Sequence, residues 1–178
     1  MKMKKTRGII YLQLILSTFF LTVLDQWTKH LAVTHLQNQS DISLIDGVLS
    51  LHYLENRGAA FGVFQNRQGA FFILTVVILA FILYVLWRMP VTKKYLPVRI
   101  FCFFLTSGAL GNLIDRIRLK YVIDFIYFSL IDFPVFNVAD IYVTVTMILL
   151  LILILFFYKE EDLDFLNRKG KHGRDNRN

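Results

Sequence analysis

The stretch IYVTVTMILLLILILFFY, Ile141 to Tyr158, contains no charged residue, and an aspartate, Asp140, stands directly before it. A helix needs about 20 mainly apolar residues, and at least about 17, to cross the hydrocarbon core of a bilayer. The stretch is therefore typical of a transmembrane helix. Asp140 raises a second question, because an ionised carboxylate at the mouth of a membrane helix is costly unless it is paired or used.

Three further uncharged runs occur along the chain, at Gly8 to Leu24, Gly69 to Trp87 and Ile100 to Ile114. The composition agrees with four spans, since 56% of the 178 residues are hydrophobic and the mean hydropathy is +0.52, values that soluble domains rarely reach. The first run follows MKMKKTR as a signal peptide would, but no A-x-A-like cleavage site follows it, which favours an uncleaved helix.

We therefore expect an all-α membrane protein, a four-transmembrane-helix bundle formed by one domain over residues 1–158. The helices are predicted at about residues 8–27, 69–88, 98–116 and 139–158, with outer loops at about 28–68 and 117–138. The outer loops contain β-prone stretches such as GVLSLHYLEN, Gly47 to Asn56, which predict short strands at the membrane surface. Residues 159–178 are almost wholly polar and are predicted to form a disordered, charged cytoplasmic tail.

The lysines and arginines predict the orientation in the membrane. Of these 20 residues, 14 lie in the N-terminal segment, the loop between the second and third runs, and the C-terminal tail, and 6 lie in the other two loops. Because positive residues accumulate on the cytoplasmic side, both termini are expected to be cytoplasmic. This distribution explains the net charge of +7 better than nucleic-acid binding does.

The acidic residues are distributed unevenly on this topology. Five of the 13 lie in the tail, and the other eight are all on the outer side: Asp25, Asp41, Asp46, Glu55, Asp115, Asp124, Asp132 and Asp140. Asp25, Asp115 and Asp140 stand at the predicted outer ends of the first, third and fourth helices. Because helix ends on one membrane face converge in a small bundle, several carboxylates are expected to meet near the outer surface.

Several roles are open to these carboxylates. Asp140 alone suits an N-cap at the positive end of a helix dipole. Asp25 and Asp115 stand at predicted C-terminal helix ends, where the dipole is unfavourable, and they need a cationic partner such as Lys29 or Arg116. Two carboxylates held close together share one proton, which permits aspartic-protease chemistry without a metal. A cation site and a proton relay in a transporter are the other options.

Other chemistries have weaker support in the sequence. The four histidines show no H-E-x-x-H spacing, and no metal or other cofactor is predicted. Ser107, in TSGALGN, lacks a full nucleophile-elbow pattern, and Ser107 with Gly108 is better explained by close helix packing. A transporter would place charged residues near the middle of its spans, where this chain has none, and a non-enzymatic scaffold leaves the outer aspartates unexplained.

Five short motifs occur in order along the chain: LDQWTK (with Asp25 and Lys29), ENRGAAFG (Glu55 to Gly62), GALGNLIDR (Gly108 to Arg116), VIDF (Val122 to Phe125) and FNVADI (Phe136 to Ile141). Together, and on four predicted helices, they resemble the lipoprotein signal peptidase family, also called signal peptidase II. Each motif alone is weak, whereas five in this order are specific. The resemblance runs from about residue 10 to residue 158.

The resemblance implies roles for particular residues. The catalytic pair that it implies is Asp124 and Asp140. The substrate-binding positions, which hold the peptide backbone or orient the pair, are Asn56, Arg116, Asn112 and Asn137. The supporting positions are Asp25, Asp115 and Gly58.

The family removes signal peptides from bacterial prolipoproteins whose cysteine already carries diacylglycerol, and it cuts just before that cysteine. The resemblance therefore implies an aspartic endopeptidase without a cofactor, in a four-helix bundle with a small extracytoplasmic β-cradle. It also implies a location in the bacterial cytoplasmic membrane, an active site near the outer face, contact with membrane lipid, and inhibition by globomycin. One chain carries the full motif set, so a monomer is expected to suffice, and no nucleic-acid partner is expected.

Overall fold

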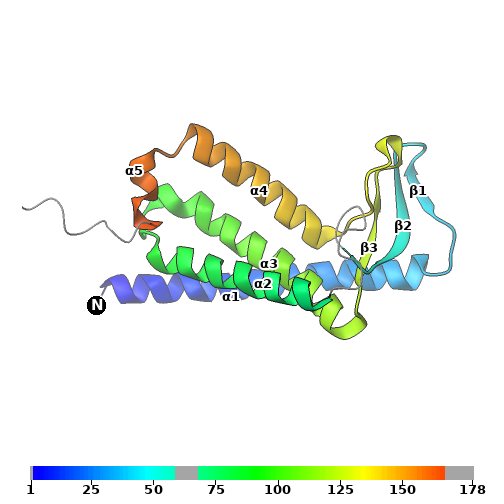
Figure 1. Ribbon diagram of the computed structural model, residues 1–178, viewed down its shortest axis with the longest axis horizontal. Helices are drawn as coiled ribbons and strands as arrows, with labels where there is room; N and C mark the ends of the chain where they lie inside the picture. The colour runs from blue at the N-terminus through cyan, green and yellow to red at the C-terminus, as the bar shows by residue number, and fades with distance from the viewer. Residues whose placement is uncertain (1, 59–67, 167–178) are drawn as a thin grey trace, which may run out of the picture.

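The computed structural model describes residues 2–58 and 68–166. Its long helices are α1 (Lys2–Leu36), α2 (Gln68–Arg88), α3 (Leu96–Leu119) and α4 (Val138–Phe156). Short 3₁₀ turns, η2 (Lys93–Tyr95) and η3 (Ser129–Ile131), lie in the connections. An antiparallel sheet has the strand order β1 (Ile42–Ile45), β2 (Leu49–Asn56), β3 (Val122–Tyr127). Figure 1 shows the helices as a bundle, with the sheet at the end where α1 finishes and α4 begins.

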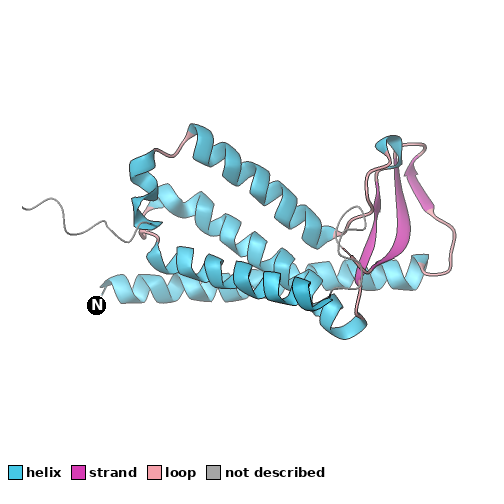
Figure 2. Ribbon diagram, viewed as in Figure 1, coloured by secondary structure: helices cyan, strands magenta, loops and turns pink. Residues whose placement is uncertain are grey.

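These elements confirm the predicted fold class. Each of the four long helices contains a segment long and apolar enough to cross a membrane. Figure 2 shows that the described strands lie at one end of the bundle. There β2, from the connection between α1 and α2, pairs with β3, from the connection between α3 and α4, and forms the predicted β-cradle. α3 is the central helix, because it contacts α1, α2 and α4, and the bounds of α2, α3 and α4 agree with the predicted ones within three residues.

The first helix is much longer than the predicted segment 8–27. α1 continues to Leu36, and its 35 residues span roughly 52 Å at about 1.5 Å per residue, well beyond a hydrocarbon core of about 30 Å. Packing stabilises the additional turns, since Ala32 and Leu36 are buried in a cluster with Ile123 of β3. The predicted end was wrong because polar residues interrupt the apolar run after residue 27, and only the tertiary structure shows that one of them, Lys29, is buried.

The start of the C-terminal tail is folded, so the prediction of disorder was wrong for residues 159–166. These residues form α5 (Glu160–Leu163) and the 3₁₀ turn η4 (Asp164–Leu166). They dock on the end of the bundle opposite the sheet, where the Tyr95 hydroxyl donates to the Asp162 carbonyl (2.9 Å) and the Phe165 ring packs edge-on against Tyr95. Apolar side chains between the charges explain this docking. Residues 167–178 lie outside the described part of the chain.

Buried apolar side chains form two clusters at different levels of the bundle. One lies toward the end opposite the sheet and consists of Ile10, Leu14, Ile82, Leu86, Met89, Tyr95, Cys102 and Phe103. The other lies under the sheet and consists of Ala32, Leu36, Ile123 and Phe125. A polar layer separates them, with buried side chains at Asp25, Lys29, Asp115, Asp124 and Asn137. Buried polar groups are costly unless they are bonded to one another, so this layer is a candidate site.

α3 and α4 approach each other closely at Gly108. A Cβ atom at this position would lie 2.6 Å from the Ala139 carbonyl oxygen and 2.7 Å from Val143 Cγ2. The neighbouring Ser107 is fully buried, and its hydroxyl donates to the Phe103 carbonyl at 2.7 Å. Both observations support the interpretation of TSGALGN as a helix-packing segment. The close approach brings the first turn of α4, which carries Asp140, against α3.

Candidate active site

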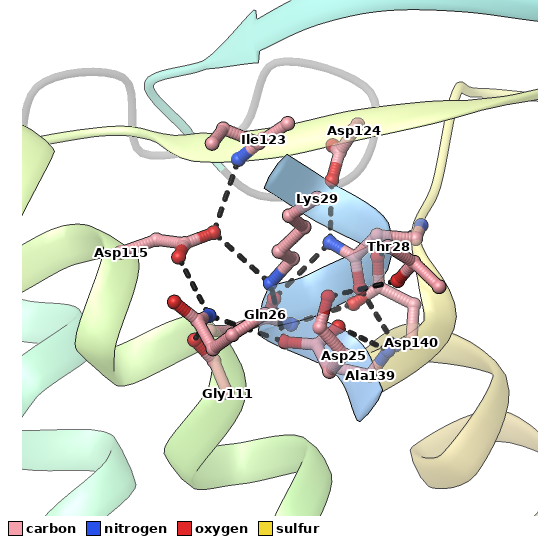
Figure 3. Close-up of polar contacts among 12 residues, drawn as sticks. Asp25, Gln26, Thr28, Lys29, Gly111, Asp115, Ile123, Asp124, Ala139 and Asp140 are labelled. Carbon is pink, nitrogen blue, oxygen red and sulfur yellow. Dashed lines mark hydrogen bonds and ion pairs between the residues drawn. The ribbon is translucent and has the colours of Figure 1, made fainter. Parts of the chain in front are cut away.

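Lys29 lies at the centre of the polar layer and forms ion pairs with two buried carboxylates. Its Nζ is 2.9 Å from Asp25 Oδ2, one turn earlier on α1, and 3.0 Å from Asp115 Oδ2 on α3 (Figure 3). Lys29 is therefore the cationic partner that both aspartates need, although Asp25 lies inside the longer α1 and not at its end. Within the two described stretches, no three His, Cys, Asp or Glu side chains are grouped as metal ligands.

The two carboxylates paired with Lys29 also bind the backbone of β3 and α4. Asp25 Oδ1 accepts a hydrogen bond from the Ala139 N–H at 2.9 Å. Asp115 Oδ2 accepts one from the Ile123 N–H at 3.2 Å. Gln26 adds a further link between α1 and α3, because its Nε2 donates to Asp115 Oδ1 at 2.9 Å. The starts of α4 and β3 are thereby tied to the polar layer, as the dashed lines in Figure 3 show.

Asn137 connects Asp124 with Asp140. It is the N-cap of α4: its Oδ1 accepts from the Asp140 N–H (3.0 Å), while Asp140 Oδ2 accepts from the Asn137 N–H (3.1 Å). Its Nδ2 donates to Asp124 Oδ1 at 2.6 Å. The N-cap is thus Asn137, and Asp140 is the third helical residue of a capping box. Asn137 thus donates to both carboxylates, to Asp140 through its backbone N–H and to Asp124 through its side chain.

Asn112 supplies the second donor to Asp140. Its Nδ2 lies 2.8 Å from Asp140 Oδ1. Its Oδ1 accepts from Lys29 Nζ (2.9 Å) and from Asn137 Nδ2 (3.1 Å). Because an ammonium group can only donate, the Asn112 amide must turn its oxygen toward Lys29 and its NH₂ toward Asp140.

Asn56, Gly58 and Arg116 lie beside Asp124, close to one another. Asn56, the last residue of β2, donates through Nδ2 to Asp124 Oδ2 (2.7 Å), and its Oδ1 accepts from the Gly58 N–H (3.0 Å). Arg116 Nη2 is 3.5 Å from the Gly58 carbonyl oxygen. The Arg116 guanidinium also lies over the Phe71 ring, 4.4 Å from its centroid, which holds the cation by a cation–π contact.

A cavity of about 590 Å³ adjoins both aspartates. Six of the predicted site residues line it: Asn56, Gly58, Asn112, Arg116, Asp124 and Asp140. The other three, which belong to the buried network, are Asp25, Asp115 and Asn137. An apolar groove of about 580 Å³ between α2, α3 and α4 continues from the cavity and shares Leu74 and Val143 with it. The structure therefore brings all nine residues into one site and its support.

Asp124 has an unusual acidity. Its side chain is buried, and burial raises its pKa to about 7, with the neighbouring Asp140 carboxylate adding to the rise. Hydrogen bonds from Asn56 and Asn137 and the charge of Lys29 oppose this rise without cancelling it. A carboxyl group with a pKa near 7 exchanges its proton readily at neutral pH, which suits it to acid–base chemistry.

Two residues of the network were not among the predicted site residues. Lys29 entered the sequence interpretation only as a possible partner of Asp25 and Asp115, and Gln26 stood in the motif LDQWTK without an assigned role. The i, i+4 spacing of Asp25 and Lys29 on one helix face is a signal that could have identified Lys29. No comparable signal exists for Gln26, because its contact with Asp115 depends on how α1 and α3 are placed.

Curated proteins resemble this chain over most of its length. Residues 17–156 match the family model described as signal peptidase (SPase) II. Lipoprotein signal peptidases of Streptococcus pyogenes serotype M5 (strain Manfredo) and serotype M1 are 40% and 41% identical to it over 148 residues. These matches cover 83% of this chain and 94% of each relative.

Solved structures agree with this result. Two bacterial membrane enzyme structures, determined by the in meso method at 2.3 Å and 1.9 Å resolution, match with TM-scores of 0.71 and 0.70 and sequence identities of 31% and 32%. The matches cover 91% and 82% of this chain and 94% of each neighbour. The chain therefore belongs to the signal peptidase II family and is a multi-pass bacterial membrane protease of lipoprotein processing.

Proposed function

We propose that Asp124 and Asp140 are the catalytic pair of an aspartic endopeptidase that cleaves diacylglyceryl-modified prolipoproteins just before the lipidated cysteine. The observation that carries the proposal is the pair itself. Both carboxylates line one cavity and accept a hydrogen bond from the buried Asn137, Asp140 from its backbone N–H and Asp124 from its side-chain Nδ2, and the pKa of Asp124 is about 7. Asp124 therefore still holds a proton near neutral pH beside a second carboxyl group, and acid–base hydrolysis of an amide requires such a proton donor.

The surroundings of the two aspartates support different roles for them. Asp124 is 1% exposed and keeps its proton up to about pH 7, so it is the acid. Asp140 is less buried and lies in the first turn of α4, at the positive end of the helix dipole, which stabilises a negative charge. Asp140 is therefore the base.

In the reaction that follows from these roles, Asp140 takes a proton from water, and the water oxygen attacks the scissile carbonyl carbon. Asp124 gives its proton to the carbonyl oxygen, which forms a tetrahedral intermediate. The amide nitrogen then takes the proton held by Asp140, the C–N bond breaks, and Asp124 recovers its proton from the hydroxyl group. The water is divided between the new carboxyl and amine, and both aspartates return to their starting states.

The lining of the cavity supports a membrane-anchored peptide as substrate. Asn56 and Arg116 border the cavity with groups able to hold a peptide backbone, and Asn112 and Asn137 orient the pair. The adjoining groove is lined by apolar side chains of α2, α3 and α4, and it suits the apolar part of a signal peptide and the acyl chains on its cysteine. Gly58, Asp25 and Asp115 are supporting residues.

We propose the remaining features together. Both termini are cytoplasmic, and the pair lies near the outer face of the bacterial cytoplasmic membrane. The sheet lies at the bundle end whose loops hold few basic residues, which supports this orientation. The chain acts as a monomer in contact with membrane lipid, and globomycin inhibits it by occupying the pair.

Incubation of the purified protein with a diacylglyceryl-modified precursor tests the proposed function. Mass spectrometry of the products should show one cut, immediately before the lipidated cysteine, and globomycin should prevent it. The unmodified precursor is the control and should stay intact. A cut at another bond, or equal cleavage of the unmodified precursor, would contradict the proposed specificity, and an absence of cleavage would contradict the activity.

The pKa of Asp124 predicts the alkaline limit of cleavage. The value of kcat/KM should fall about tenfold per pH unit above about pH 7, because Asp124 then loses the proton that it donates. Initial rates between about pH 5 and pH 9 measure this limb. Neither His30 nor His52 lines the cavity, so His30→Gln and His52→Gln are controls whose limb should not move. A wild-type rate that stays level to pH 9 would exclude Asp124 as the acid.

A further inference from the structure

We propose that Lys29 is a positioning residue for the aspartate pair, and that it sets the place of Asp124 and of Asp140 through three separate contacts. The inference rests on the proposed function of the pair. Lys29 itself does not line the cavity, so its effect on the reaction passes through Asp25, Asp115 and Asn112.

The first contact fixes the backbone before Asp140. Lys29 holds Asp25 by an ion pair of 2.9 Å, and the other oxygen of Asp25 accepts the N–H of Ala139. Ala139 is fully buried and immediately precedes Asp140. Its N–H belongs to the first turn of α4, where no partner within the helix is available. The ion pair thus holds α4 at the residue next to the base.

The second contact fixes the backbone before Asp124 in the same manner. Lys29 holds Asp115 at 3.0 Å, and the same Asp115 oxygen accepts the N–H of Ile123. Ile123 immediately precedes Asp124 in β3. The residue before each aspartate of the pair therefore donates its N–H to a carboxylate, and both of these carboxylates are ion-paired with Lys29.

The third contact fixes a side chain. The Lys29 ammonium donates to Asn112 Oδ1, which leaves Asn112 Nδ2 as the donor to Asp140. A neutral side chain with an acceptor atom at this place would allow the amide to turn over and present its oxygen to the carboxylate. The fixed charge of Lys29 excludes that arrangement.

Lys29 also acts on the pair through its charge. The charged groups around Asp124 are Lys29 and Asp25 on α1, Asp115 and Arg116 on α3, and Asp140 on α4. Lys29 lowers the pKa of Asp124, against the larger effects of burial and of Asp140. Loss of the ammonium should therefore move the alkaline limb of kcat/KM to higher pH.

The decisive variant removes the ammonium together with one of the two carboxylates that it pairs with. Lys29→Met alone would leave two buried carboxylates unpaired, which threatens the fold. The double variant Lys29→Gln/Asp25→Asn keeps the net charge of the three-residue cluster unchanged, and asparagine at position 25 still offers an oxygen to the Ala139 N–H. We expect a folded protein with kcat reduced at least tenfold, KM nearly unchanged, and the alkaline limb displaced upward.

Matched controls separate this proposal from its alternatives. Lys120→Gln removes an exposed lysine on the same side, whose Nζ contacts the Ile117 carbonyl, and should leave the rate and the limb unchanged. The double variant with wild-type kcat and an unmoved limb would overturn the proposal. An inactive wild-type protein would instead contradict the proposed function.

A second charge-balanced variant, Lys29→Gln/Asp115→Asn, covers the case in which the first does not fold. It removes the same ammonium while it retains Asp25, and the same loss of kcat and the same displacement of the limb are expected. If neither double variant folds while Asp25→Asn and Asp115→Asn do, Lys29 serves the stability of the fold alone and the proposal is overturned. Thermal unfolding in detergent measures the folded fraction of each variant.

Discussion

Asp124→Asn should lower the rate of precursor cleavage by at least about a thousandfold, toward the upper end of the roughly 10²- to 10⁴-fold effects of single acid–base groups. Asparagine has nearly the shape of aspartate but carries no proton that it can give to a carbonyl oxygen. Asp140→Asn should cause a loss of the same order, since it removes the base. Mass spectrometry of the lipidated precursor measures both rates, at equal amounts of membrane-inserted protein.

Asp132→Asn is the matched control for these variants. Asp132 is an exposed aspartate in the same connection between α3 and α4 as Asp124, and it accepts a hydrogen bond from the Tyr127 hydroxyl at 2.7 Å without lining the cavity. Its backbone has a positive φ of 50°, which asparagine also tolerates. This variant should keep the wild-type rate. Near-normal turnover by Asp124→Asn or Asp140→Asn would remove the pair from the mechanism.

Asp124→Asn should lose activity but gain stability relative to the wild type as the pH rises. The pKa of Asp124 rises from the ordinary 3.8 to about 7 on folding. The group therefore stabilises the fold fully below about pH 4, and this contribution is lost as the pH rises through about 7. The unfolding temperature of the wild type should fall relative to that of the variant between about pH 5 and pH 8.5. The asparagine NH₂ group at position 124 would face the donor of Asn56 or Asn137, and this cost does not depend on pH. Comparing the two proteins at two pH values therefore cancels it.

The helices were predictable because a bilayer imposes a simple requirement. An uncharged run of sufficient length crosses the membrane whatever its neighbours are, and the spans of α2 and α4 follow from composition. The run within α3 is shorter, and its span needs the long Arg99 side chain to reach an interface. The C-terminal end of α1 was not predictable in this way. The sequence predicts that Lys29 lies in a loop. In the structure Lys29 is buried within α1, where its ion pairs with Asp25 and Asp115 compensate its charge. The same holds for the docked segment 159–166, which needs Tyr95 as a partner.

The candidate site was predictable in its membership but not in its geometry. Charge counting places Asp124 and Asp140 on one side of the membrane, and the motifs single them out. Their difference in burial arises from tertiary structure, because Asp124 lies within β3 in contact with Asn56 and Asn137, while Asp140 lies at a helix start. The contact between Asn56 and Asp124 depends on the irregular pairing of β2 with β3, which has a register shift between Leu51 and Leu54. No periodicity in the sequence encodes such a shift.

Gly108→Ala should reduce cleavage at least about a hundredfold, since displacement of a reacting group by about 1 Å has effects of this size. The new Cβ would lie 2.6 Å from the Ala139 carbonyl oxygen, and a helix backbone cannot turn aside as a flexible side chain can. The first turn of α4 must then move away from α3. That movement lengthens the 2.8 Å hydrogen bond between Asn112 and Asp140 and separates Ala139 from Asp25.

The same substitution should lower the free energy of unfolding by about 1–3 kcal/mol, the usual cost of overpacking. Gly69→Ala is the matched control, because a Cβ atom at Gly69 in α2 meets nothing within 4 Å. It should leave the rate unchanged and the stability equal or slightly higher, as alanine favours a helix over glycine. Rates normalised to the folded fraction separate the two effects of Gly108→Ala. A wild-type rate and unfolding temperature in this variant would show that α3 and α4 do not need their close contact to hold Asp140 in place.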